Sequence, residues 1–92
     1  MPRSKVRFEP TPNPDAGKFT VGRTLVEGRS GRSYDSPESA AADPVAAPLL
    51  ALEGVRSVFM VADFVTVIKE PGARWPDLAP RVEAALRDAL RA

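Results

Sequence analysis

Two apolar runs near the middle of the 92-residue chain leave it few ways to fold. Segments 55–61 (VRSVFMV) and 64–69 (FVTVIK) are dense in β-branched and aromatic residues at odd and even positions alike. Only Ala62 and Asp63 separate them, which predicts a β-hairpin. Aspartate tolerates a positive φ better than alanine, so we expect Asp63 to adopt it in the turn. Strands apolar on both faces need a cover on each side.

The clearest amphipathic pattern in the chain follows this hairpin. Pro76 suits the first position of a helix, where its missing N–H costs nothing. The apolar residues then recur at helical spacing, which predicts one helix that buries a single face. They are Trp75, Leu78, Ala79, Val82, Ala85, Leu86, Ala89 and Leu90.

A second helix is predicted before the hairpin, from Asp43-Pro44 to about Leu52, with Gly54 as the left-handed residue that ends it. It would bury apolar side chains such as Leu49. Pro48 lies inside it, so its first turn should be tight or kinked. Ser36-Pro37-Glu38 resembles another helix start, but a weaker one.

The first part of the chain predicts two more strands. Residues 5–10 and 18–21 alternate apolar and polar side chains, with Phe8 and Phe19 directed toward the core. The connection TPNPDAG carries two prolines, which fix φ and push the residues before them toward extended backbone. Residues 22–35 are rich in Gly, Ser and Arg and predict a loop, with short extended pieces at 24–26 and at Tyr34.

The expected order is therefore strand, strand, helix, strand, strand, helix. Helices gathered on one face of a mostly antiparallel sheet make an α+β sandwich of two layers. A chain of 92 residues supports one core, so we expect residues 1–92 to form a single domain.

Composition excludes several kinds of function. The chain has no cysteine and no histidine, so it lacks the thiolate and imidazole ligands that zinc, copper, haem and iron–sulfur clusters usually require. It has no cysteine to form a disulfide framework, the stretch MPRSKVRFEP contains no apolar core of the kind a signal sequence needs, and no apolar run is long enough to span a bilayer. These features favour a cytoplasmic protein.

Two other function classes remain open. Residues 1–34 carry seven Lys and Arg against three Asp and Glu, so the basic N-terminal half could bind nucleic acid, with Phe8 and Phe19 as the candidates for stacking on bases. Core positions for both aromatics argue against this. An enzyme could use Asp63 and Glu70 as a carboxylate pair, but their spacing is ordinary for a turn and a strand end, and no nucleophile has a visible base.

Three blocks in this order are specific together: TPNPDAGKF, LEGVRSVFMVADFVTVIKE, and a tryptophan followed by LAPRVEAAL. Across residues 6–90 they resemble the N-terminal domain of the Nfu/NifU-type iron–sulfur cluster scaffold family. Full-length members of that family carry a second domain whose CxxC pair binds the cluster and passes it to apo-proteins. We expect that domain to be absent here, so the resemblance assigns cluster ligation to no residue of this chain.

The resemblance implies a non-catalytic accessory module that binds a partner and holds no cofactor by itself. The expected partner is an iron–sulfur client or a cluster-carrying CxxC protein, bound by a monomer of this chain. The residues expected to contact it are Thr11, Asn13, Pro14, Asp15, Lys18, Arg56 and Asp63. The competing interpretation is that Pro12 and Pro14 only stiffen a turn, which would stabilise the fold by about 0.4 to 1 kcal/mol each.

Overall fold

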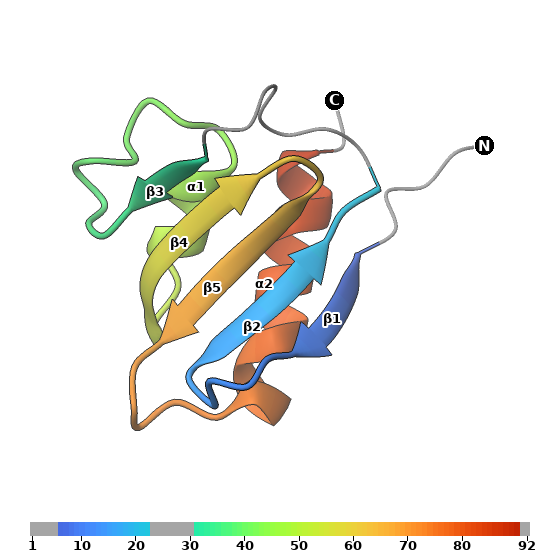
Figure 1. Cartoon of the computed structure of the whole chain (residues 1–92). Coiled ribbons are helices and arrows are strands. Elements are labelled where there is room, and N and C mark those ends of the chain that lie inside the picture. Colours follow the sequence, from blue (N-terminus) through green and yellow to red (C-terminus); the bar gives the residue numbers. More distant parts are fainter. Residues whose placement is uncertain (1–5, 23–30, 91–92) are drawn as a thin grey trace.

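A computed structural model describes residues 6–22 and 31–90 and shows two layers, a five-stranded sheet and two helices behind it (Figure 1). The sheet order is β1-β2-β5-β4-β3, and every neighbouring pair is antiparallel. The elements are β1 (Arg7–Pro10), β2 (Ala16–Thr20), β3 (Arg32–Tyr34), α1 (Ala46–Leu50), β4 (Val55–Val61), β5 (Phe64–Lys69) and α2 (Trp75–Ala89). The predicted α+β sandwich is confirmed.

The central hairpin has the predicted bounds, because β4 and β5 coincide with the two apolar runs. The prediction for its turn was wrong, since Ala62 has the positive φ, 52°, and Asp63 does not. The carbonyl oxygen of Asp63 accepts a hydrogen bond of 2.9 Å from the backbone N–H of Val21. This bond ties Asp63 to the end of the neighbouring chain segment, so the left-handed conformation falls on the residue before it.

The N-terminal strands are confirmed in type and face. Phe8 of β1 lies opposite Phe19 of β2, and both are on the helix-covered side. Lys5, the predicted first residue of β1, lies outside the described residues. β2 begins at Ala16, before the predicted Lys18, because the TPNP turn closes with a hydrogen bond of 3.0 Å from the Ala16 N–H to the Asn13 carbonyl.

The sheet has a fifth strand that the predicted order lacks. β3 pairs with β4 over three residues, and Tyr34 lies opposite Val58. The extended piece expected at Tyr34 is therefore part of a strand, while the one expected at 24–26 lies outside the described residues.

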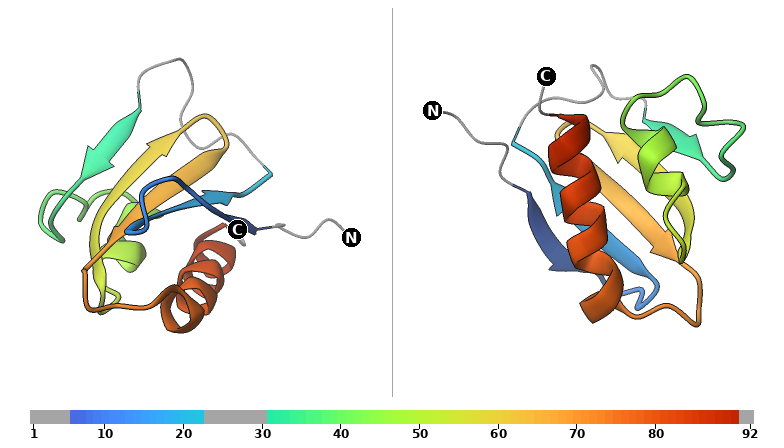
Figure 2. Two further views of the ribbon diagram at one scale, coloured as in Figure 1. Left: turned by 60° about the horizontal axis from the view of Figure 1, so that its bottom comes forward. Right: turned by 180° about the vertical axis from the view of Figure 1, so that it is seen from behind.

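Helix α2 matches its prediction, starting at Trp75 with Pro76 in its first turn. Its buried face is Leu78, Ala79, Val82 and Leu86, with Leu90 just beyond its end. Figure 2 shows α2 lying across the sheet, with α1 beside it. The core between the layers includes Phe19, Leu49, Val58, Val65, Val67, Leu78, Val82 and Leu86.

Helix α1 is shorter than predicted, spanning only Ala46–Leu50. Asp43 caps it as expected, because its Oδ1 accepts hydrogen bonds from the N–H groups of Val45 (2.9 Å) and Ala46 (3.0 Å). The C-terminal turn is tight, with the Leu52 N–H bonded to the Leu49 carbonyl at 3.1 Å, so the α-helical pattern stops before Leu52.

Gly54 has the expected left-handed backbone, with φ 98°. The weaker helix start at Ser36 forms turns instead of a helix. Ser36 and Ser39 bond to each other's backbone N–H groups at 3.2 and 3.3 Å, which is the capping-box pattern of a helix start, but the turns that follow do not continue into a helix.

Candidate functional site

The TPNP turn is held by its own side chains. The Thr11 hydroxyl lies 2.9 Å from the Asn13 carbonyl oxygen and 3.0 Å from that of Ala16, and it accepts a hydrogen bond from the Asn13 N–H. Asn13 Oδ1 accepts from the Asp15 N–H at 2.9 Å. These bonds define one conformation, with Pro12, Asn13 and Pro14 exposed at its tip. The Thr11 hydroxyl and the side-chain carbonyl oxygen of Asn13, two of the polar groups that the sequence offered for partner binding, thus make hydrogen bonds within the turn.

Asp15 fastens the turn to the far end of β5. Its Oδ1 lies 3.0 Å from Lys69 Nζ, and its carbonyl accepts from the Lys69 N–H at 2.8 Å. The Lys69 side chain is only 9% exposed, against 42% for Asp15, so the pair neutralises a lysine that is otherwise buried. The first role of Asp15 is structural.

An aromatic cluster attaches the turn to α2. Trp75 Nε1 donates a hydrogen bond of 3.0 Å to the Pro14 carbonyl. The centre of the Trp75 ring lies 5.2 Å from the centre of the Phe8 ring and 6.1 Å from that of Phe19. Gly17 lies beneath these rings, where a Cβ would come within 2.6 Å of Phe8 and 2.9 Å of Trp75. Phe8 and Phe19 are therefore packed between the layers, where they cannot stack on bases.

The other predicted contact residues do not form one surface with the turn. Lys18 lies on the sheet face away from the helices, with its Nζ 4.6 Å from the centre of the Phe64 ring. Arg56 is exposed at an irregularity in β4 near the TPNP end, and Asp63 is exposed in the hairpin turn at the other end. The length of β5 separates Asp63 from Glu70 by roughly 20 Å, too far for a catalytic carboxylate pair.

A buried polar group ties β3 to α1. The Tyr34 hydroxyl donates to Asp43 Oδ2 at 3.0 Å, and Arg32 Nη1 lies 4.0 Å from the same oxygen. Burial, together with the hydrogen bond to Asp43 and the charge of that carboxylate, raises the pKa of Tyr34 above its ordinary value. The same carboxylate caps α1, so this group orients the helix against the sheet.

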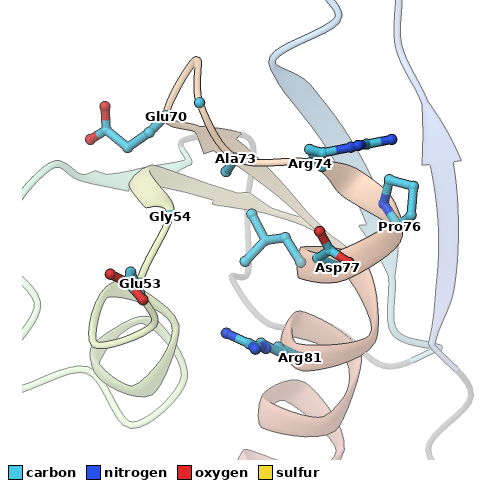
Figure 3. Close-up of a pocket in the computed structure, with 10 residues that line it drawn as sticks. Glu53, Gly54, Glu70, Ala73, Arg74, Pro76, Asp77 and Arg81 are labelled. Atoms are coloured by element: carbon cyan, nitrogen blue, oxygen red, sulfur yellow. The ribbon is translucent and has the colours of Figure 1, made fainter.

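A pocket of about 700 Å³ lies between the end of α1, the loop after β5 and the start of α2 (Figure 3). Leu78, Ala73 and Gly54 supply apolar surface. Its charged side chains, all exposed, are Glu53, Glu70, Arg74, Asp77 and Arg81. Arg81 extends from α2 toward Glu53 in Figure 3. None of the described residues that line this pocket carries a hydroxyl, thiol or imidazole, and its ionisable groups are carboxylates and guanidinium groups.

Sequence reasoning missed this pocket, because it joins residues from three separate segments. It also left unassigned the second apolar face of the hairpin, where Phe59 is 39% exposed. The sequence does indicate a second apolar face, since both hairpin strands are apolar at odd and even positions.

The comparisons with known proteins agree with this geometry. The family model described as "Scaffold protein Nfu/NifU N terminal" matches residues 6–92. The chain belongs to this family. The mitochondrial NFU1 iron-sulfur cluster scaffold homolog of Drosophila persimilis is 40% identical over 85 residues, which cover 90% of this chain and 29% of that protein. The corresponding protein of Drosophila willistoni is 41% identical with the same coverage. The chain thus spans less than a third of the length of these relatives.

Solved structures agree with the Nfu/NifU assignment. The crystal structure of protein SAV1430 from Staphylococcus aureus matches with a TM-score of 0.78 and 33% identity, covering 88% of this chain and 96% of that one. A NifU-like protein from Saccharomyces cerevisiae has a TM-score of 0.74 at 21% identity, covering 94% of this chain and 77% of that one, and supports the fold alone. The resemblance drawn from the three sequence blocks is confirmed.

Two features are absent from residues 6–22 and 31–90 of this Nfu/NifU N-terminal chain. No group of three or more His, Cys, Asp or Glu side chains is arranged to hold a metal ion. None of the helices in that part of the chain combines the length and apolar character needed to cross a membrane.

Proposed function

We propose that this chain is a non-catalytic protein-interaction module in iron–sulfur cluster assembly or delivery, and that it does not ligate a cluster itself. Membership of the Nfu/NifU N-terminal family carries the proposal. The chemistry of the chain supports it, because none of its 92 residues is a cysteine or histidine. The cluster chemistry belongs to a partner, either a CxxC-containing carrier or an apo-protein client.

The first test asks whether the chain holds a cluster. Purified protein is incubated anaerobically with iron and sulfide and then passed through gel filtration. We expect no stoichiometric cluster absorbance to elute with the chain, because oxygen ligands alone hold iron–sulfur clusters poorly. A cluster retained in stoichiometric amount would contradict the proposal.

The second test asks for the partner. A purified CxxC cluster-carrying domain and an apo-ferredoxin are titrated into the chain, and binding is measured by calorimetry. We expect saturable binding to at least one of them, and absence of binding to both would count against the proposed function.

The seven predicted contact residues stay predictions, and two of them can be tested separately. Lys18→Ala changes the sheet face, while Asn13→Ala changes the tip of the TPNP turn. If Asn13→Ala keeps both fold and affinity, the turn serves structure alone. The cytoplasmic location and monomeric state also stay predictions from the sequence. The Drosophila relatives are named mitochondrial, and the state of this chain can be measured by sedimentation.

A further inference from the structure

One face of the sheet carries no helix or strand of the described residues. In Figure 1 both helices lie behind the sheet, and the view from behind in Figure 2 places them on that same side. Side chains alternate along each strand, so every second residue points away from the helices. On the three central strands these residues, here named the open face, are Lys18, Thr20, Ser57, Phe59, Val61, Phe64, Thr66 and Ile68.

The open face is more apolar than a solvated sheet requires. Phe59 is 39% exposed even though its ring lies over Gly31, where a Cβ would approach it to 2.5 Å. Val61 and Phe64 lie directly opposite each other across β4 and β5, and Ile68 continues the apolar surface along β5. All three are half-buried. One exposed aromatic side chain beside several half-buried apolar ones makes a continuous apolar area, and such an area indicates a site of interaction.

Three charged residues on this side lie along one flank, in β1 and β2. Lys18 is at the border of the apolar area, and its ammonium lies over the Phe64 ring. Arg7 is opposite Thr20 on the outer strand β1, and Glu9 is opposite Lys18. In the described part of the chain neither Arg7 nor Lys18 takes part in a salt bridge. Both cations are therefore available to form an ion pair with a carboxylate of a partner.

We infer that the open face is a docking surface for a protein whose contact area is apolar at its centre and carries carboxylates on the side that meets Lys18 and Arg7. This deepens the proposed function and rests on it only for the choice of protein probes. It places the main contact on the sheet and not on the TPNP turn, where Thr11 and Asn13 already make hydrogen bonds within the turn. Lys18 is the predicted contact residue that belongs to the open face.

Other occupants fit less well. In the described parts of β1 and β2, a second copy of the chain offers one carboxylate, Glu9, to the two cations Arg7 and Lys18. A nucleic acid binds largely through cations that contact its phosphates, and the described residues on the flank of the open face supply two, Lys18 and Arg7. Phe59 and Phe64 could stack on bases, but the aliphatic Val61 and Ile68 could not. The half-buried aliphatic side chains and small number of cations match a protein surface.

The test is an NMR titration of the isotopically labelled full chain. The probes are the CxxC domain, apo-ferredoxin, a single-stranded DNA oligonucleotide, and a synthetic amphipathic helix with leucines along one face and glutamates beside it. A peptide with lysines in place of the glutamates is the charge control. We expect amide shifts concentrated in β4, β5 and β2, and weaker binding of the lysine peptide.

Two pairs of variants measure the contribution of the face. Phe59→Ser should weaken binding about tenfold or more, because exposed aromatics dominate such contacts, while Ala84→Ser on the exposed side of α2 should change nothing. Lys18→Glu should weaken binding about threefold to tenfold. Arg87→Glu gives the same change in net charge on the helix layer and should leave affinity unchanged.

The outcomes separate this inference from the proposed function. If the glutamate peptide binds the open face and neither iron–sulfur protein binds, the proposed function fails and the docking surface stands. If an iron–sulfur protein binds but shifts only the TPNP turn or the pocket, the docking surface is wrong and the proposed function stands. The inference is also overturned if no probe shifts the open face, if the lysine peptide binds as well as the glutamate peptide, if the chain dimerises through this face, or if single-stranded DNA binds there.

Discussion

Gly17→Ala should destabilise the fold although it adds one methyl group. The new Cβ would lie 2.6 Å from a Phe8 ring carbon and 2.9 Å from two Trp75 ring carbons, well inside van der Waals contact. Phe8 and Trp75 cannot both move away from the new Cβ freely. The centre of the Phe8 ring lies 5.0 Å from that of Phe19, and Trp75 Nε1 donates a hydrogen bond to the Pro14 carbonyl. Overpacking of this kind costs about 1 to 3 kcal/mol of unfolding free energy.

The measurement is equilibrium unfolding in urea, followed by the fluorescence of Trp75, which is the only tryptophan in the chain. We expect the midpoint to fall with little change in slope, and the emission of the folded state to shift because the ring must move. The matched control is Gly72→Ala, since no atom lies within 4 Å of the Cβ that it would add. If Gly17→Ala were as stable as Gly72→Ala, the close packing described for this cluster would be wrong.

Two further predictions concern the polar links between the layers and strands. Asp15→Ala should lower the unfolding free energy by about 1 to 3 kcal/mol, because it removes the carboxylate that neutralises Lys69. Adding Lys69→Met should restore most of the lost free energy, and a double variant less stable in urea than Asp15→Ala alone would contradict this. Raising the pH should destabilise the fold through Tyr34: its folded pKa lies above the unfolded value of about 10, so its contribution is complete below that pH and is lost as the pH rises through the folded pKa. The chain has one tyrosine, so the change in tyrosine absorbance at alkaline pH reports the ionisation of Tyr34 alone. Between neutral and alkaline pH, Tyr34→Phe should lose less melting temperature than the unchanged chain. Equal losses in the two proteins would refute the role given to Tyr34.

The helices and strands with a long, regular pattern of apolar residues could be predicted from the sequence, and the others could not. β4, β5 and α2 have the expected bounds because their patterns are long and their neighbours are turn residues. β3 has three residues, too few to show an alternation. The positive φ falls on Ala62, next to Asp63, whose carbonyl accepts a hydrogen bond from the Val21 N–H about 40 residues earlier, and local preference pointed to Asp63 instead.

The candidate site was harder to predict, because its residues acquire their roles from distant partners. The prolines correctly indicated a stiff turn at 11–16. Nothing near Asp15 in sequence shows that its carboxylate bonds to Lys69, 54 residues away. Lys18 and Asn13 are close in the chain, yet one lies on the sheet and the other at the tip of the turn.

Successive side chains of β4 point to opposite faces of the sheet, so the contribution of this strand to the core and its contribution to the open face can be measured separately. Val58 and Met60 point to the helices and are almost fully buried, while Phe59 between them points to the open face. Met60→Ala should therefore cost about 2 to 5 kcal/mol of stability, because it leaves a cavity in the core. Phe59→Ser should cost no more than about 1 kcal/mol, the value of its cross-strand contacts. If Phe59→Ser unfolded the chain as strongly as Met60→Ala, the phenylalanine would be part of the core, and the open face could not be the surface that binds a partner.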